Sequence, residues 1–512
     1  MSAVLHSALI DELVNIVGPA NVCCDEPTRE LASSDLFLWS GAVLADAVVR
    51  PGSTGELAQV VAVLARNGTA IVPRGAGLSY TAGAVPHRAA VVIDSLRLNQ
   101  VIVHADDLYA VVGAGTNWQA LAEALKPHGL RAAQISPISG SHSTVGGTAS
   151  QNIPGGLDNI LGLTVVLADG SVVHTGSAAR VGASAFARYA GPDLTGLFLG
   201  DCGAFGFKAE VVVRLTVERE AAFASFSFQT ADAMMAALVC LRRRELVTRA
   251  MSMDSLKAQS ATRIDVAEAA SVVKAVVKEA GSIGRALKDL AQLATGRSAV
   301  KDAGWSLHLT VEAVTESLAQ GQMDLARAVC CVDGQEINNL IPKTLRAKPY
   351  SIRGLVGPDG ERWVPVHAIL PLSRAEACMR ALQAKLTSEA AAMATVGIKH
   401  SWIISTIGAY VTIEPMFYWQ DQLDAIHLAH LSERNQTRFG QGSVNAGARE
   451  LLTRLRAELR DVMREHDAVH GQMGRFYPYL PLLDSATQTL VSRIKHALDP
   501  ARTMNPGVLG LI

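Results

Sequence analysis

The sequence lacks the cysteine pattern of a disulfide-stapled or zinc-binding protein. Its seven cysteines are odd in number and include no C-x-x-C pair, so neither a disulfide framework nor a zinc module is supported. A reducing compartment fits this usage best. We therefore expect a cytoplasmic protein.

An excess of charge is also missing. The 46 basic and 47 acidic residues give a formal net charge of −1, so the overall balance indicates no attraction to nucleic acid or to an acidic membrane surface. No run of about 18 uncharged apolar residues occurs, and no transmembrane helix is expected. The N-terminal stretch carries acids within its apolar pattern and has no basic leader, which predicts an amphipathic helix and not a signal peptide.

What the chain does have is length and apolar residues. With 512 residues, 49% of them hydrophobic, it exceeds the size at which one core keeps growing, so two or more domains are expected. Residues 47–217 alternate short β-rich runs with helical stretches, and the helical stretch between the strand candidates 47–49 and 71–72 is predicted to end at Asn67-Gly68. Asp169-Gly170 between two valine runs predicts a hairpin. The spacing is not the regular βαβ repeat of a Rossmann domain. We expect an α+β domain over 1–217.

The rest of the chain changes character. Residues 218–440 combine alanine-rich helical stretches with strand candidates at 305–311, 363–371 and 401–414, a pattern typical of an antiparallel sheet flanked by helices. Residues 441–512 are predicted to be a mainly helical tail.

Four segments of small residues punctuate the sequence. The first, at 73–79, directly follows a short apolar strand; the others are 139–152, 200–207 and 505–507. Glycine lets a ligand approach the main chain, and successive N–H groups of such a loop form an anion-binding concavity. For any one segment a tight structural turn is an equal alternative. The combination favours a phosphate-binding function.

In this order the four segments resemble the FAD-linked oxidases of the vanillyl-alcohol oxidase and p-cresol methylhydroxylase superfamily. The resemblance is closest to the branch with D-lactate dehydrogenase and the glycolate oxidase flavoprotein subunit, and it covers nearly the whole chain. It is carried by Pro-Arg-Gly-x-Gly at 73–77, Gly146-Gly147, Asp193-Leu194-Thr195, and Asp-Pro-x-x-x-x-Asn-Pro-Gly at 499–507.

The resemblance implies a two-part FAD-binding domain of the p-cresol methylhydroxylase (PCMH) type over 1–217, an antiparallel-sheet cap with flanking helices over 218–440, and a tail over 441–512 that returns to the FAD domain. Relatives that attach FAD covalently through the first loop use a histidine there; this loop has none, so we expect non-covalent FAD, with His142 as the alternative link. The cofactor-binding residues that the resemblance implies are Pro73, Arg74, Gly75, Ala76, Gly77, Leu78, Ser79, Ser139, Gly140, Ser143, Thr144, Gly146, Gly147, Gly200, Gly203, Gly206 and Asn505.

One motif departs from the family. D-lactate and D-2-hydroxyglutarate dehydrogenases have a His-Gly-Glu-His-Gly motif that contributes to a divalent metal site, whereas this chain has His470-Gly471-Gln472-Met473-Gly474. An amide and a thioether replace the carboxylate and the second imidazole, which are the ligands that such cations prefer. We predict no catalytic metal. His427 and His430 are more simply explained as solvated or core histidines than as ligands.

Candidates for handling the substrate lie in two places. Arg475 could bind a carboxylate bidentately and Tyr477 could donate to or deprotonate a hydroxyl, unless this segment is only an aromatic packing turn. On the predicted cap strand, Tyr410 and Glu414 share a face by the strand period, and His400 is a further candidate base. Glu414 could equally be an ordinary ion-pair partner. Arg353 and His367 have weaker cases.

The resulting hypothesis is an FAD-dependent dehydrogenase or oxidase acting on a hydroxyl-bearing carbon, with a 2-hydroxy acid as substrate. One alternative is a phenolic or benzylic alcohol or an alkylphenol, and another is a flavoprotein subunit that only relays electrons. The electron acceptor is not evident from the residues, and a homodimer is left open.

Overall fold

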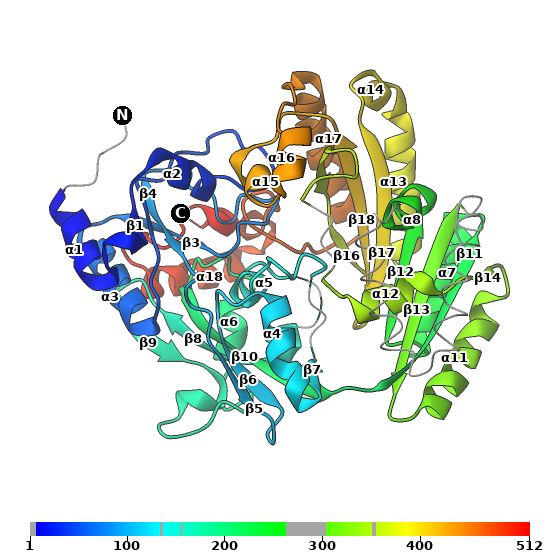
Figure 1. Cartoon of the computed structure of the whole chain (residues 1–512), viewed down its shortest axis with the longest axis horizontal. Helices are drawn as coiled ribbons and strands as arrows, with labels where there is room; N and C mark the ends of the chain where they lie inside the picture. The colour runs from blue at the N-terminus through cyan, green and yellow to red at the C-terminus, as the bar shows by residue number, and fades with distance from the viewer. Residues whose placement is uncertain are drawn as a thin grey trace. The chain divides into compact units, whose positions relative to one another are not determined.

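The computed structural model describes residues 7–133, 137–153, 155, 157–262, 304–350 and 355–511 (Figure 1). Contacts divide the chain into two compact units. Unit 1 comprises Met1–Val217, Leu423–Gly440 and His470–Ile512, and unit 2 comprises Glu218–Gln422 and Gln441–Val469. The sequence placed boundaries after 217 and 440; the contacts also divide the chain after Val217, but they assign 423–440 to unit 1 and 441–469 to unit 2.

Unit 1 has a small, mostly parallel sheet next to its N-terminal helices. Its strand order is β1-β2-β4-β3, in which β2, β4 and β3 run parallel and β1 is antiparallel to β2. These strands are β1 (Val22–Cys23), β2 (Ala47–Val49), β3 (Ala70–Arg74) and β4 (Ala90–Asp94). The helices of unit 1 are α1 (Ser7–Val17), α2 (Glu26–Ala32), α3 (Thr54–Arg66), α4 (Trp118–Leu125), α5 (Val145–Ser150), α6 (Leu194–Phe198), α15 (Ala425–Ala429), α16 (Glu433–Phe439) and α18 (Ser485–Leu498).

Helix α3 follows directly from its sequence. Ser53 accepts a hydrogen bond from the N–H of Glu56, whose carboxylate accepts one from the N–H of Gly52, so the first turn is capped from both sides. Leu57, Val60, Val61 and Leu64 recur at helical spacing and are fully buried in one core with α1 and the first sheet. Burying such a side chain stabilises the fold by roughly 1.5–3 kcal/mol. The helix ends, as predicted, at the Asn67-Gly68 step.

A second sheet of unit 1 is antiparallel, with strand order β5-β6-β10-β8-β9 and β7 paired with β10. Its strands are β5 (Val101–His104), β6 (Tyr109–Gly113), β7 (Leu130–Ala132), β8 (Ile160–Val166), β9 (Val172–His174) and β10 (Phe207–Val217). The predicted hairpin is confirmed between β8 and β9, where Gly170 has a φ of 87°. Only a residue without a Cβ adopts that conformation easily.

Unit 2 is built on one eight-stranded antiparallel sheet of order β14-β11-β13-β12-β17-β18-β15, with β16 paired to β18. The strands are β11 (Glu220–Phe228), β12 (Arg249–Asp254), β13 (Trp305–Ala313), β14 (Gln335–Ile337), β15 (Arg362–Pro365), β16 (Ala368–Pro371), β17 (Lys399–Ile407) and β18 (Tyr410–Trp419). The helices are α7 (Ala231–Arg243), α8 (Ser255–Thr262), α11 (Glu316–Cys330), α12 (Leu340–Ala347), α13 (Ala375–Ser388), α14 (Ala390–Thr395) and α17 (Ala446–Glu465). The α+β fold with an antiparallel-sheet second domain is confirmed.

The two faces of this sheet differ in character. Helices α7 and α11 pack against β11 and β13 (Figure 1), where Phe226, Leu307 and Leu309 are fully buried. On the other face Met251, Met253 and Ile403 form an apolar cluster with residues of α8 and α12. Because side chains alternate along a strand, these two sets lie on opposite faces, which we call the helix-covered face and the methionine face.

Candidate functional site

The loop after β3 leaves its main-chain N–H groups unused. No described residue accepts a hydrogen bond from the backbone N–H of Gly75, Ala76, Gly77 or Leu78, and successive N–H groups of this kind form an anion-binding concavity. Side chains are excluded here: a Cβ would lie 2.0 Å from Arg74 Nη2 if added to Gly77, and 2.4 Å from Thr144 Oγ1 if added to Gly75. Each glycine is therefore required by the side chain that packs against it.

Arg74 lies buried beneath this loop. Its guanidinium donates to the carbonyls of Ser34 (2.8 Å) and Leu31 (2.9 Å) and therefore faces the main chain. Burial lowers the pKa of Arg74 to about 10, against the opposing effect of the Asp94 and Asp35 carboxylates. The side chain is still a cation at neutral pH and supplies a fixed positive charge beside the loop. Its Nη2 packs against Gly77, 2.0 Å from where a Cβ on that residue would lie.

The second small-residue segment packs directly against the first. Thr144, whose Oγ1 closes over Gly75, caps α5 by accepting a hydrogen bond from the N–H of Gly147 (3.1 Å). A Cβ on Gly146 would lie 2.5 Å from the Ala114 Cβ. The Ser139 and Ser143 hydroxyls lie 2.6 Å apart, and the N–H of Gly140 donates to Pro137. This segment presents hydroxyls and bare backbone, as predicted from its composition.

The third segment is a tight turn around a buried carboxylate. Asp201 accepts from the N–H groups of Gly203 (2.9 Å) and Phe205 (3.1 Å) and pairs with Lys208. Gly200 and Gly203 have φ values of 69° and 72°. A Cβ on Gly203 would lie 2.8 Å from Pro73 Cγ, and one on Gly206 2.5 Å from Val165 Cγ1. These glycines thus have packing reasons of their own, and their contact with a cofactor stays a prediction.

Residues of the C-terminal tail hydrogen-bond to the loops that carry the other small-residue segments. Asn505 Nδ2 donates to the carbonyls of Gly83 (2.8 Å) and Cys202 (2.6 Å), and its N–H donates to Ile71 of β3 (2.8 Å). Arg475 donates to the carbonyls of Ala82 (2.5 Å) and Pro506 (2.7 Å). The four segments that the sequence singled out therefore meet at one place in unit 1. Burial lowers the pKa of Arg475 to about 10, so it adds a second cation there.

The segment that departs from the metal-binding motif is folded into this meeting point. His470 is buried and stacks on Tyr477 with ring centroids 4.1 Å apart, and Tyr477 is also fully buried. The N–H of Gly474 donates to Cys202 Sγ (3.2 Å). Within the described ranges no group of three or more His, Cys, Asp or Glu residues could hold a metal ion, and the absence of a catalytic metal stays a prediction. Arg475 and Tyr477 have structural contacts that the sequence did not reveal.

The predicted cap-strand residues in unit 2 do not form one site. Glu414 lies on the methionine face opposite Ile403, and its Oε2 is 3.7 Å from Nδ1 of His367. Tyr410 is on the same face but at the exposed start of β18. His400 pairs across the strands with Phe417, so it points to the helix-covered face, and burial lowers its pKa. His400 and Glu414 therefore cannot act together without a rearrangement.

A histidine pair in unit 1 escaped the sequence argument. His430, at the end of α15, lies with its ring centroid 4.5 Å from that of His142. Burial lowers the pKa of both rings, and that of His430 falls to about 4 because His142 and Arg74 are also near. The sequence explained His430 as solvated or core, because nothing local to either residue indicates the pairing. Arg353 lies outside the described residues.

Comparison with known proteins identifies the cofactor of unit 1. A model of the FAD binding domain matches residues 45–176, which contain the first two small-residue segments. Residues 45–176 form an FAD-binding domain. The glycolate oxidase subunit GlcD of Bacillus subtilis is 30% identical over 220 residues, which are 41% of this chain and 45% of that protein. A mitochondrial D-lactate dehydrogenase (cytochrome) of Arabidopsis thaliana is 30% identical over 224 residues, which are 41% and 38% of the two chains.

These sequence matches span less than half the length of either curated relative. Solved structures match much further: 4-ethylphenol oxidase from Gulosibacter chungangensis, in an isoeugenol complex, has a TM-score of 0.74 at 17% identity over 99% of this chain and 97% of that one. p-Cresol methylhydroxylase with substrate bound has a TM-score of 0.73 at 16% identity over 99% and 96%. At such identities the likeness shows the fold, which is that of these flavoproteins.

The loop geometry fits FAD. The pyrophosphate of FAD is a dianion, and the free N–H groups at 75–78 with two buried arginines nearby suit it. Added Cβ atoms at Gly75 or Gly77 would collide with Thr144 or Arg74 and so displace the loop that carries these N–H groups. FAD is the cofactor, as the resemblance implied.

Proposed function

We propose that the protein is an FAD-dependent oxidoreductase that oxidises a hydroxyl-bearing carbon of a small substrate without a metal. The observation that carries the proposal is the cradle at 75–78, with its unused N–H groups and its two glycines. Bound FAD supplies the electron acceptor for such a reaction. The protein's share is to bind, orient and move a proton.

In this proposal the main-chain N–H groups of Gly75 to Leu78 bind the pyrophosphate. Arg74 and Arg475 favour the bound anion through their charge while their guanidinium groups hold neighbouring carbonyls in place. Asn505 fixes the loop at Gly83 against the turn at Cys202. The site is therefore rigid before the cofactor binds, which lowers the entropic cost of binding.

Glu414 is our choice for the group that takes the hydroxyl proton. It is a partly exposed carboxylate with an imidazole 3.7 Å away, and burial, opposed by Glu414 and reinforced by Arg456, lowers the pKa of His367. A neutral imidazole beside a carboxylate can orient it and share its proton. Tyr477 is too buried to reach a substrate in this structure, and His400 points to the other face.

A 2-hydroxy acid remains the first substrate candidate, and the sequence relatives GlcD and D-lactate dehydrogenase carry names of that class. The contacts of Arg475 favour the second candidate, a phenolic or benzylic alcohol or an alkylphenol. Its two Nη atoms already donate to the carbonyls of Ala82 and Pro506, so a substrate carboxylate would have to displace them.

The test is anaerobic reduction of the FAD-loaded protein, followed by the loss of visible flavin absorbance. A panel of D- and L-2-hydroxy acids and para-substituted phenols would be added with and without EDTA. Bleaching by hydroxy acids supports the first candidate, and bleaching by phenols alone supports the second. Bleaching by neither, or complete inhibition by EDTA, would overturn the proposal.

The role of Glu414 is tested in the same assay. Glu414→Gln should slow bleaching by about a hundredfold or more, as expected for loss of a general base. The exposed Glu450→Gln is the matched control and should reduce at the wild-type rate. An unchanged rate in Glu414→Gln would exclude this residue as the base.

A further inference from the structure

A surface loop of unit 1 combines a fixed base with an apolar tip. It runs from the short helix Gly176–Ala179 to α6. At its base the N–H of Ser177 donates to Ala187 (2.8 Å), Ser177 Oγ donates to Ser184 (2.7 Å), and the N–H of Ala187 donates back to Ser177 Oγ (3.1 Å). The loop is thus held in one conformation by bonds that close its neck. We call residues 180–194 the protruding loop.

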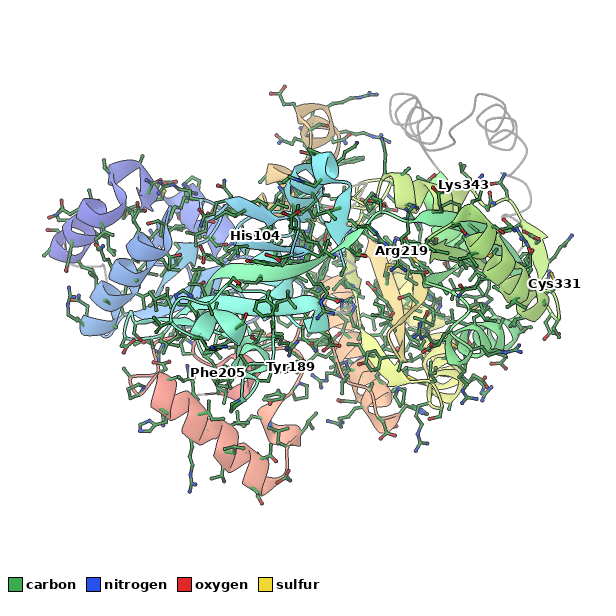
Figure 2. All side chains as sticks on the ribbon, turned by 90° about the horizontal axis from the view of Figure 1, so that it is seen from below. His104, Tyr189, Phe205, Arg219, Cys331 and Lys343 are labelled. Atoms are coloured by element: carbon green, nitrogen blue, oxygen red, sulfur yellow. The ribbon has the colours of Figure 1, made fainter. Side chains whose placement is uncertain are left out.

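The protruding loop presents large apolar side chains to solvent, among them Tyr189, which is labelled in Figure 2. Val181 is 107% exposed, Phe186 60%, Tyr189 71% and Leu194 47%. A value above 100% means that no neighbouring side chain shields Val181 at all. Since single domains bury residues of this kind when they can, several of them on one fixed loop mark an interaction site.

The charged side chains of the loop are the second feature, because its acidic residue is paired and one of its arginines is not. Arg188 Nη2 pairs with Asp193 at 2.8 Å, and its guanidinium lies 5.6 Å from the ring centroid of Tyr189. Asp193 is the one acidic residue between 180 and 194, so no carboxylate of the loop is left unpaired. Arg180 is exposed, and no described residue pairs with its guanidinium. The tip is therefore apolar with one free positive charge.

We propose that the protruding loop docks the protein on a lipid bilayer that contains anionic lipid. A stable protein–protein interface buries about 800 Å² on each partner. The four exposed apolar side chains of the loop, of which an aromatic buries about 150–250 Å², fall short of that area. Phe and Tyr beside a basic residue suit the bilayer interface, where rings enter the acyl boundary and the cation remains at the headgroups. The overall charge of −1 does not reveal this local pattern.

The test is co-sedimentation of the full-length, FAD-loaded protein with vesicles. Phosphatidylcholine vesicles would be compared with vesicles that also contain phosphatidylglycerol. We expect binding to the anionic vesicles that weakens with added salt, and weaker binding to phosphatidylcholine alone. The double variant Val181→Ser with Phe186→Ser should bind the anionic vesicles about tenfold or more weakly. Each substitution removes an apolar side chain that would enter the bilayer, and with it the free energy of transferring that side chain out of water. Arg180→Ala should bind both vesicle types equally, with the affinity that the wild type has for phosphatidylcholine vesicles.

The matched control is Leu318→Ser with Leu325→Ser on α11, two side chains that are 57% and 60% exposed in unit 2. It should bind vesicles as the wild type does. Retained FAD absorbance shows that unit 1 is folded in each variant, and an unchanged far-UV circular dichroism spectrum shows that the α11 control keeps its fold. The proposal is overturned if the wild type does not bind, if the loop variant binds equally well, or if the α11 control loses binding to the same extent. A change of oligomeric mass in the loop variant would show that a second copy covers the tip and would also overturn it.

Discussion

At the scale of single residues, Arg74 and Gly77 show that a sequence pattern typical of phosphate binding can also be required for packing. The resemblance implied that Arg74, next to a glycine loop, is a cofactor-binding residue. In the structure the Arg74 side chain fills the space where a Gly77 Cβ would be and binds main-chain carbonyls of 31–34. The glycine is therefore required twice, once for its left-handed φ of 72° and once for the arginine beside it.

Gly77→Ala tests this double requirement. The substitution forces a non-glycine residue into the left-handed region, at a cost of roughly 1–2 kcal/mol, and displaces Arg74 from beneath the cradle. We expect the Kd for FAD, measured by titration of the apoprotein with FAD fluorescence, to rise at least tenfold. Gly68→Ala is the control, because Gly68 also has a positive φ (62°) but no atom lies within 4 Å of its added Cβ. That variant should lose stability and keep its FAD affinity; equal affinity losses in both would show that strain alone explains the effect.

At the scale of secondary-structure elements, His308 shows how strand pairing buries a polar group. It lies between β11 and β12 on β13, with Nδ1 2.9 Å from Ser225 Oγ and Nε2 3.1 Å from Ser306 Oγ. Burial lowers the pKa of His308 from 6.5 to about 3. The folded protein thus keeps this ring neutral at a pH at which the unfolded chain would protonate it.

The consequence is a loss of stability on acidification. Because the unfolded state binds more protons between the two pKa values, the contribution is fully present above about pH 6.5 and falls as the pH drops toward 3. For this one group the free energy of unfolding should fall by about 2 kcal/mol between pH 7 and pH 5. His308→Gln should remove this part of the pH dependence of the unfolding free energy, measured by urea unfolding of unit 2. Exposed His128→Gln should leave it unchanged, and an unaltered slope in His308→Gln would contradict the assignment.

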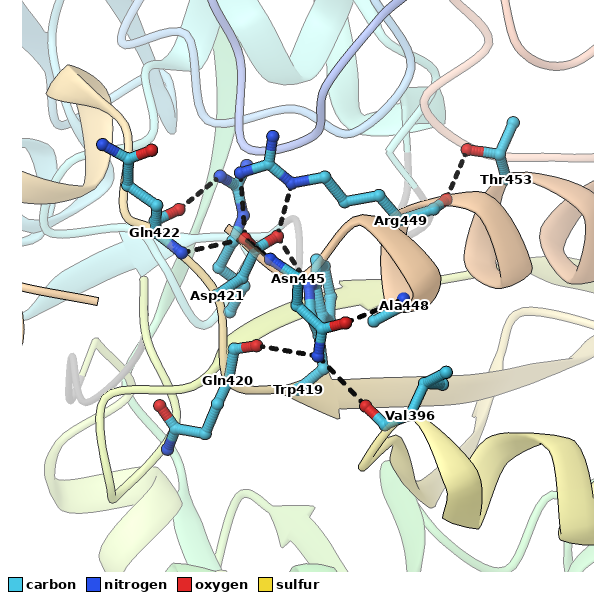
Figure 3. Close-up of polar contacts among 10 residues, drawn as sticks. Val396, Trp419, Gln420, Asp421, Gln422, Asn445, Ala448, Arg449 and Thr453 are labelled. Atoms are coloured by element: carbon cyan, nitrogen blue, oxygen red, sulfur yellow. Dashed lines mark hydrogen bonds and ion pairs between the residues drawn. The ribbon is translucent and has the colours of Figure 1, made fainter. Parts of the chain in front are cut away.

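A polar cluster holds the end of β18 to the start of α17 (Figure 3). Asp421 accepts two hydrogen bonds from Arg449 (2.7 and 2.9 Å) and one each from the indole of Trp419 (2.9 Å) and the N–H of Asn445 (3.0 Å). Burial alone would raise the pKa of Asp421, but Arg449 and these donors hold it below its usual value. The cluster joins the place where the chain leaves unit 2, after Gln422, to the place where it returns.

Asp421→Asn should therefore destabilise unit 2. An amide cannot accept all of these bonds and removes the negative charge that pairs with Arg449, so we expect a loss of roughly 3–5 kcal/mol in the unfolding free energy of unit 2. Hydrogen exchange should also accelerate in the first turns of α17, which carry Arg449. The chemically identical change Asp324→Asn breaks an exposed pair with Arg327 and should cost at most about 1 kcal/mol. Similar losses in the two variants would show that the cluster is not a special anchor.

The sequence predicted those elements whose signals are local. The Asp169-Gly170 hairpin, the end of α3 at Asn67-Gly68 and the antiparallel character of the second domain followed from turn chemistry and periodicity. The pairs Glu414–His367 and His142–His430 did not, because each joins distant positions that only strand pairing or chain return brings together. Arg475 shows the remaining difficulty: its charge suggested a ligand, whereas its partners are carbonyls that no sequence pattern marks.

At the scale of the whole molecule, the cofactor domain depends on chain that is distant in sequence. Residues 503–505 bond to β3 through Ile71, Lys495 Nζ donates to the carbonyl of Ala204 (2.8 Å), and Arg88 donates to the carbonyl of Arg502 (2.7 Å). Unit 1 is thus complete only when the final helix and tail have been made. None of the helices in the described part of the chain has the length and apolar character needed to cross a bilayer.

This division predicts how the protein unfolds. Unit 1 contains the FAD-binding domain, and a ligand stabilises the unit that it binds, by about 2.7 kcal/mol when present at a hundredfold excess over its Kd. Calorimetry should therefore show two transitions, of which FAD raises one and leaves the other unchanged. Asp421→Asn, which alters a cluster within unit 2, should lower the second transition in the same scans and so assign it. Two outcomes would contradict this prediction: FAD raises both transitions equally, or a single transition responds to both FAD and the substitution. Either would show that the two units unfold as one cooperative unit.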